Sequence, residues 1–115
     1  MIPETNRYKI KSIEVGGVSP FFLIAGPCVA EDRDLLFSVA EEMQRICARL
    51  EIPYIFKTSF DKANRSSISG YRGPGMELAL GWLAELKEKY GFPILRDVHE
   101  PSQCQAAAEI ADVLQ

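Results

Sequence analysis

Hydrophobic positions switch between alternating and helical spacing along the chain, which predicts strands and helices in turn. Polarity alternates over residues 7–15, as in a half-exposed strand or hairpin, until Gly16-Gly17 interrupts it. Residues 21–25 are apolar at every position. We therefore expect a strand there that is buried on both faces of a parallel sheet.

Two longer segments repeat apolar residues every three or four positions, which predicts amphipathic helices. The first is expected over residues 32–50, with Asp32 and Asp34 near its start, where the helix dipole favours negative charge. The second is expected to end at Tyr90, with Gly91 as its C-terminal cap. The apolar stripes consist of Leu36, Val39, Ala40, Met43, Ile46, Cys47 and Leu50, and then of Met76, Ala79, Leu80, Leu83, Leu86 and Tyr90.

Short apolar runs at residues 54–56 and 93–95 predict two further buried strands. Pro101 is suited to the first position of a third helix, expected over residues 102–111, and residues 112–115 resemble the opening of a fourth strand. This alternation predicts an α/β fold with parallel strands and right-handed crossovers. A chain that stops inside a strand is expected to be incomplete.

Composition narrows the class of protein. The 115 residues suffice for one modest domain, and 47% hydrophobic with 25% charged residues is ordinary for a soluble globular protein. A net charge of -3 argues against nucleic-acid binding through overall positive charge. No apolar run reaches the roughly 20 residues that span a bilayer. Three irregularly spaced cysteines, without a signal-peptide core, fit a reducing cytoplasm.

Unusual polar clusters follow each of the first three buried strands. Cys28 follows the first, residues 57–67 follow the second, and residues 97–100 follow the third. Ligands of parallel α/β folds bind at the carboxyl ends of the strands. The second cluster carries two lysines and an arginine, which suit phosphates and carboxylates. The three clusters therefore predict one shared, anion-binding active site.

The individual side chains leave alternatives open. Cys28 is either a buried thiol or one ligand of a metal, and a single thiolate does not make a metal site. Lys57 and Lys62 are either solvated charges or anion ligands, and Lys57 favours the second because it directly extends an apolar strand. His99 is expected to be a structural hydrogen-bonding group, whereas the role of Asp97 stays open.

Three motifs together resemble one enzyme family. Gly26-Pro27-Cys28, residues 56–67 (FKTSFDKANRSS) and residues 96–100 (RDVHE) occur in the order found in 3-deoxy-D-manno-octulosonate 8-phosphate synthases, and the likeness covers nearly the whole chain. The resemblance implies that residues 1–115 are the N-terminal part of a (β/α)8 TIM barrel preceded by a β-hairpin. They would form a single, incomplete domain with about three and a half βα units.

The family resemblance also implies an activity. These synthases condense phosphoenolpyruvate with D-arabinose 5-phosphate and water, and they release inorganic phosphate during synthesis of a lipopolysaccharide precursor. A cytoplasmic homotetramer is implied for the full-length protein, with no nucleic-acid or membrane partner. We expect the 115-residue chain to be inactive alone, because the family's later ligands and cations are absent from it.

Site residues follow from the resemblance by position. Lys57, Ser59 and Lys62 would contact phosphoenolpyruvate, and Gln115 would lie near its carboxylate. Catalytic roles would fall to Lys57, Lys62 and Asp97. The remaining assignments place Asn64, Arg65 and Ser66 on the sugar phosphate, Asp97 along the sugar chain, and Cys28 on a divalent metal of the Fe, Zn, Mn or Co type.

Two other functions stay open. One is the sister activity of 3-deoxy-D-arabino-heptulosonate 7-phosphate synthase, which shares the Gly-Pro-Cys turn but typically has Lys-Pro-Arg-Thr-Ser in the cationic motif. Residues 62–67 of this chain, KANRSS, argue against that alternative. The other is a non-catalytic barrel that binds sugar phosphates, for which a metal-binding cysteine would be unnecessary.

Overall fold

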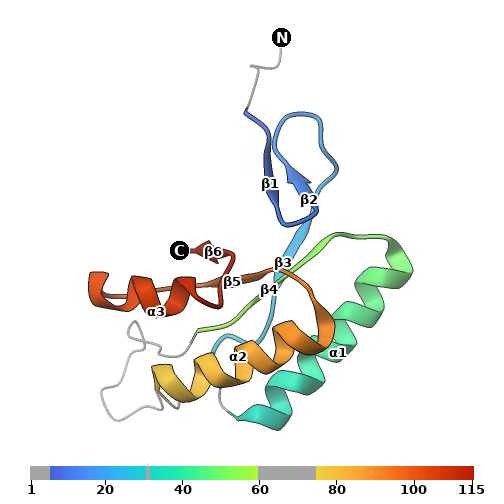
Figure 1. The fold of residues 1–115 in the computed structure, drawn as a ribbon. Coiled ribbons are helices and arrows are strands. Elements are labelled where there is room, and N and C mark those ends of the chain that lie inside the picture. Colours follow the sequence, from blue (N-terminus) through green and yellow to red (C-terminus); the bar gives the residue numbers. More distant parts are fainter. Residues whose placement is uncertain (1–5, 31, 60–74) are drawn as a thin grey trace.

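The computed structural model describes residues 6–30, 32–59 and 75–115 (Figure 1). Strands and helices alternate as the sequence predicts. In chain order they are β1 (Tyr8–Ile10), β2 (Ile13–Val15), β3 (Leu23–Ala25), α1 (Arg33–Leu50), β4 (Tyr54–Lys57), α2 (Met76–Tyr90), β5 (Ile94–Arg96), the 3-10 turn η1 (Pro101–Gln103), α3 (Cys104–Ala108) and β6 (Val113–Leu114).

The main sheet has four strands in the order β3-β4-β5-β6, and every neighbouring pair is parallel. Ala25 pairs with Phe56, and Phe56 pairs in turn with Ile94. Each strand is therefore added beside the one before it, and all carboxyl ends reach the same edge. This arrangement confirms the predicted α/β class and its parallel sheet.

One face of the sheet carries the main core beneath α1 and α2, which lie side by side (Figure 1). Phe56 and Ile94 from the strands pack there against buried Leu36 of α1 and Leu83 of α2. Fully burying each such side chain contributes about 1.5–3 kcal/mol, so this layer is a main source of stability. The predicted helical stripes are confirmed at these positions, whereas Leu50 at the end of α1 is 55% exposed.

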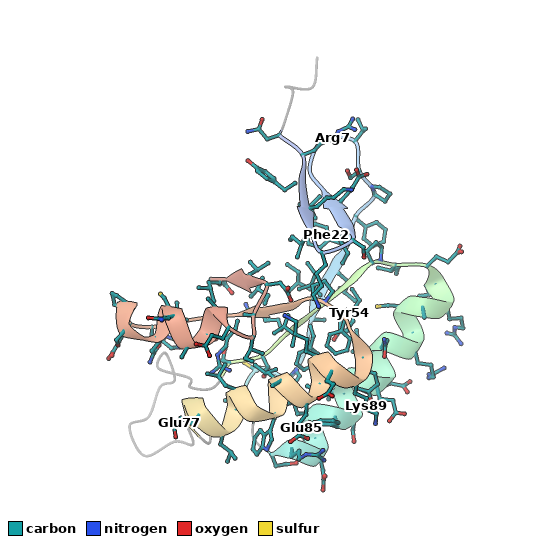
Figure 2. The ribbon with its side chains drawn as sticks, in the orientation of Figure 1. Arg7, Phe22, Tyr54, Glu77, Glu85 and Lys89 are labelled. Carbon is teal, nitrogen blue, oxygen red and sulfur yellow. The ribbon has the colours of Figure 1, made fainter. Side chains whose placement is uncertain are left out.

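The opposite face of the sheet holds a smaller core formed with the antiparallel pair of β1 and β2. Ile13 of β2 packs with Ile55 and Leu95, and Phe22 packs against this group. Figure 2 shows Phe22 at the junction between the β1–β2 pair and the main sheet. Ile13 and Glu14 of β2 also line one pocket with Pro53 and Pro93, which directly precede β4 and β5, so the pair lies at the amino ends of these strands.

The start of α1 and the end of α2 lie where the sequence predicts helix caps. Asp32 is the N-cap of α1, and its carboxylate accepts a hydrogen bond of 2.8 Å from the Leu35 backbone N–H. Gly91 follows α2 with φ 74°, and its N–H donates to the Lys87 carbonyl at 2.9 Å. That backbone conformation favours glycine, so the predicted cap is confirmed.

Two expectations about element burial and length are wrong. Residues 21–25 are not buried on both faces, since Phe21 is 73% and Ile24 is 40% exposed. The strand covers only Leu23–Ala25, so Phe21 precedes it, and Ile24 lies in β3 at the edge of the described sheet. The third helix is also shorter than residues 102–111, because its chain turns after Ala108, with Ile110 N–H donating to the Ala107 carbonyl at 3.2 Å.

Among the described residues, none of the helices has the length and hydropathy needed to cross a bilayer.

Candidate functional site

A pocket of about 300 Å³ opens at the carboxyl ends of β3 and β4. Cys28 and Lys57 both line it, from two different strand ends. Cys28 is exposed, which removes the buried thiol from the two alternatives that the sequence left open and does not test the metal-ligand alternative. Lys57 is half-buried as the last residue of β4. A thiol and an ammonium group that lie far apart in sequence thus share one concave surface.

The turn that carries Cys28 is attached to the chain after β4 by several bonds. The Thr58 hydroxyl donates to the Pro27 carbonyl at 2.8 Å, and Ala30 N–H donates to the Ser59 carbonyl at 2.8 Å. Val29 and Ser59 form an isolated parallel bridge. These contacts extend the pairing of β3 with β4 past the strands, so that Cys28 has a fixed position relative to Lys57.

Gly26 is required by the same close approach of the two chains. A Cβ atom at this position would lie 1.8 Å from the Lys57 carbonyl oxygen, a distance that no real contact reaches. The glycine in the Gly-Pro-Cys turn therefore allows the backbone of β3 to pass directly against β4. Sequence reasoning identified the turn but missed this function of its glycine.

The predicted residues Asp97 and Gln115 come together at the end of β5. Gln115 N–H donates to the Arg96 carbonyl at 3.0 Å, and Val98 N–H donates to the Gln115 carbonyl at 3.0 Å. These bonds place Gln115 directly across from Asp97. One carboxylate oxygen of Asp97, Oδ1, is buried and has no hydrogen-bond partner among the described residues.

His99 lies beside Asp97, with 3.3 Å between Nε2 of the imidazole and Oδ2 of the carboxylate. Its backbone N–H donates to Oε1 of Gln103 at 2.8 Å, and Glu100 and Gln103 form a capping box around η1. The turn after β5 is thus held by side-chain hydrogen bonds. Sequence reasoning noticed Pro101 but missed Gln103, although Glu at the cap and Gln three residues later resemble the capping-box pattern.

Arg96 is a charged residue whose role the sequence did not reveal. Its side chain has no exposed area. Burial lowers the pKa of the guanidinium to about 10, because removal from water disfavours the charged form, and the neighbouring Asp97 carboxylate acts in the opposite direction. Arg96 therefore adds a desolvated positive charge next to Asp97.

The structure brings together some of the predicted site residues and leaves others undescribed. Cys28 shares a pocket with Lys57, and Asp97 adjoins Gln115, which directly follows β6. Ser59 is 1% exposed, with its carbonyl bonded to Ala30. Lys62, Asn64, Arg65 and Ser66 lie outside the described residues.

Metal binding needs three or four protein ligands in most sites. Among residues 6–30, 32–59 and 75–115, no group of three His, Cys, Asp or Glu side chains is arranged to hold an ion. The described residues thus contribute one candidate ligand, Cys28, and do not form a metal site by themselves.

The fold and the pocket define an α/β protein whose polar site lies at the carboxyl ends of parallel strands, as in enzymes of this architecture. The sequence model of the DAHP synthetase I family matches residues 2–115. The chain belongs to this family.

Curated relatives with high identity share one name, 2-dehydro-3-deoxyphosphooctonate aldolase. The protein of Fusobacterium nucleatum is 51% identical over 115 residues, which are the whole chain and 41% of that protein. The protein of Marinobacter nauticus is 52% identical over 110 residues, or 96% of the chain and 39% of the relative. The protein of Acinetobacter baylyi is 50% identical over 107 residues, which are 93% of the chain and 38% of that protein. The chain thus spans about two fifths of the length of these relatives.

Proposed function

We propose that the full-length protein condenses phosphoenolpyruvate with D-arabinose 5-phosphate and water, giving 3-deoxy-D-manno-octulosonate 8-phosphate and inorganic phosphate. The observation that carries this proposal is the pocket that joins Cys28 to Lys57, in a chain about 50% identical to proteins named for this enzyme. Its product would serve lipopolysaccharide precursor synthesis in the cytoplasm, and the full-length enzyme would be a homotetramer.

The strand order supports a closed (β/α)8 barrel, with β1 and β2 as the hairpin that closes its bottom. In an open doubly wound sheet the order reverses near the middle, whereas a barrel adds every strand on the same side. Here β3, β4, β5 and β6 follow one another without reversal. Exposed Ile24 of β3, at the edge of the described sheet, would then be covered by later parts of the barrel.

The reactants require clustered positive charge, because both carry phosphate and phosphoenolpyruvate also carries a carboxylate. In this proposal Lys57, Ser59 and Lys62 hold phosphoenolpyruvate, with Gln115 near its carboxylate. Asn64, Arg65 and Ser66 hold the sugar phosphate, and Asp97 faces the sugar chain. Holding two polyanions in one site of reduced dielectric makes the attack effectively intramolecular.

The chemistry forms one carbon–carbon bond and breaks one bond to phosphate. The methylene carbon of phosphoenolpyruvate attacks the aldehyde carbon of the sugar, whose oxygen takes up a proton. Water adds to the adjacent carbon, which develops positive character, and inorganic phosphate leaves. Lys57 lines the pocket, and in this proposal its ammonium neutralises charge on the bound phosphoenolpyruvate.

Cys28 would supply a thiolate to a divalent metal whose other ligands lie outside the described residues. Such an ion, when bound, acts as a Lewis acid toward water or a carbonyl oxygen. The exposure of Cys28 at the pocket fits a ligand role, since a thiol that merely packs is usually buried.

The proposal is tested by measuring phosphate release from phosphoenolpyruvate with the full-length protein. Release should require D-arabinose 5-phosphate and should be much slower with erythrose 4-phosphate. Efficient turnover of erythrose 4-phosphate would favour the sister synthase. Binding of sugar phosphates without any release would favour a non-catalytic barrel.

Variants at the two pocket residues refine this test. Lys57→Gln should lower kcat/KM by about 100-fold, whereas the exposed Lys89→Gln on α2 should leave it unchanged. Cys28→Ser should reduce the metal content measured by elemental analysis together with the activity. Full activity of Cys28→Ser after treatment with a chelator would overturn the metal assignment.

A further inference from the structure

Thr58 is a polar residue of the candidate site to which the family resemblance gives no role. It borders the pocket with Cys28 and Lys57, yet it is 1% exposed. Its hydroxyl donates to the carbonyl of Pro27, the residue before Cys28, at 2.8 Å. We propose that Thr58 is a positioning residue, which acts on the reaction by fixing Cys28 relative to Lys57. This inference rests on the proposed function, in which Cys28 and Lys57 act in one pocket.

The chain around Cys28 has one residue more than the chain against which it lies. Strands β3 and β4 pair at Ala25 and Phe56, and the two chains pair again at Val29 and Ser59. Three residues of the first chain, 26–28, therefore lie opposite two residues of the second. An extra residue of this kind, as in a β-bulge, interrupts the ladder of hydrogen bonds and is common beside active sites.

The interrupted segment contains a residue that cannot complete the ladder. Pro27 has no N–H, so it cannot donate a hydrogen bond to the neighbouring chain. The Thr58 hydroxyl supplies a bond between the two chains instead, one residue before Cys28. Two residues after Cys28, the Ala30 N–H donates to the Ser59 carbonyl at 2.8 Å. Cys28 therefore lies between two hydrogen bonds that join its chain to the chain after β4.

The geometry points to an indirect role for Thr58. Its hydroxyl hydrogen is directed to the Pro27 carbonyl, and its burial leaves the side chain little access to a ligand in the pocket. Removal of the hydroxyl would leave the Pro27 carbonyl without this donor and would allow the turn to shift. A displacement of about 1 Å in a catalytic site can lower a rate about 100-fold, so even a small movement of Cys28 should be measurable.

Tyr54 offers a matched control, because its hydroxyl makes the same kind of bond. It donates to the Ala25 carbonyl, also at 2.8 Å, in the strand that leads to Cys28. Ala25 lies inside β3 and is paired with Phe56, whereas Pro27 lies beyond the strand. Tyr54→Phe should therefore lower stability without moving Cys28.

The first test compares phosphate release from phosphoenolpyruvate and D-arabinose 5-phosphate by variants of the full-length protein. Thr58→Val, which removes the hydroxyl and keeps a branched side chain, should lower kcat/KM about tenfold. Thr58→Ser, which keeps the hydroxyl, should restore kcat/KM close to that of the unmodified protein, and Tyr54→Phe should leave it unchanged. Full activity of Thr58→Val, an equal loss in Tyr54→Phe, or failure of serine to rescue would each overturn the positioning role.

The second test does not depend on turnover. Hydrogen exchange of the Ala30 amide, measured by mass spectrometry of the peptide that contains it, should be about tenfold faster in Thr58→Val. The rate should stay close to that of the unmodified protein in Thr58→Ser and in Tyr54→Phe. Unchanged exchange in Thr58→Val would overturn the proposal even if every variant were active. If the unmodified protein released no phosphate, the proposed condensation would fail, and the exchange rates would still decide whether Thr58 holds the turn.

Discussion

The α-carbon of Gly26 lies directly against the carbonyl of Lys57, so closely that an added Cβ would stand 1.8 Å from the carbonyl oxygen. The atom in the way is backbone of β4, which is paired on both sides and has little room to move. The absence of a side chain at Gly26 thus allows both the pairing of β3 with β4 and the close position of Cys28 relative to Lys57.

Gly26→Ala should therefore lower the free energy of unfolding by about 3 kcal/mol or more, measured by urea denaturation of the full-length protein. The contact can be relieved only by separating β3 from β4, which moves Cys28 away from Lys57. The matched control is Gly81→Ala in α2, where a Cβ meets no atom within 4 Å. It should raise stability by about 0.5–1 kcal/mol. A mild effect of Gly26→Ala would contradict the close approach.

The second prediction compares Tyr90→Phe with Tyr54→Phe, each of which removes one hydroxyl oxygen. The Tyr90 hydroxyl is buried without a hydrogen-bond partner among the described residues, so Tyr90→Phe should leave stability unchanged or raise it by about 1 kcal/mol. The Tyr54 hydroxyl donates to the Ala25 carbonyl, so Tyr54→Phe should cost about 1 kcal/mol. Thermal unfolding of both variants under one condition compares them. The same sign for both would count against this reading of the two hydroxyls.

The third prediction concerns stability in alkaline solution. Burial raises the pKa of Tyr54 well above its usual value of 10, and the nearby Cys47 acts in the same direction. The unfolded chain then ionises this tyrosine first, so its contribution to stability is complete below about pH 10 and is lost as pH rises further. At about pH 11 the loss should be about 1 kcal/mol relative to pH 8.

This loss is measured as a difference between two proteins. The gap in unfolding free energy between the unmodified protein and Tyr54→Phe should narrow between about pH 8 and pH 11. Tyr8→Phe, at a residue that is 62% exposed, should show no such change. A constant gap for Tyr54→Phe would show that its hydroxyl ionises freely in the folded state.

The fourth prediction concerns Asp112, which connects three elements. Its carboxylate accepts the Ile94 N–H at 3.0 Å, pairs with Lys87 of α2 at 3.3 Å and lies 4.0 Å from Lys11. Asp112→Ala leaves the start of β5 without this acceptor and should cost about 2–3 kcal/mol in urea unfolding. Exposed Glu109→Ala provides the control and should stay within about 0.5 kcal/mol.

The sequence predicted those features that arise from local pattern. The apolar stripe that includes Leu36 predicted α1, and the stripe that includes Leu83 predicted α2. Asp32 marked the start of α1, and Gly91 marked the end of α2. These signals are readable because periodicity and capping involve residues within a few positions of one another. The polar edge of the sheet was also predictable, because the carboxyl ends of parallel strands lie at the same edge and the polar clusters follow these strands in the sequence.

Features that depend on distant neighbours were not readable. The exposure of Ile24 follows from the edge position of β3, and apolar composition does not reveal which strand lies at an edge. The contact of Gly26 with Lys57 and the burial of Arg96 likewise result from strands separated by many residues. Cys28 could not be assigned from its own surroundings, and its exposure became visible only in three dimensions.

The β1–β2 pair packs at one end of the main sheet, whereas Cys28 and Lys57 share a pocket at the carboxyl ends of the strands, where Asp97 also follows β5. Substitutions at the carboxyl ends of the strands can therefore change the candidate site without changing the packing around Ile13. Substitutions of Ile13 should accordingly lower the free energy of unfolding and leave the geometry of the candidate site unchanged.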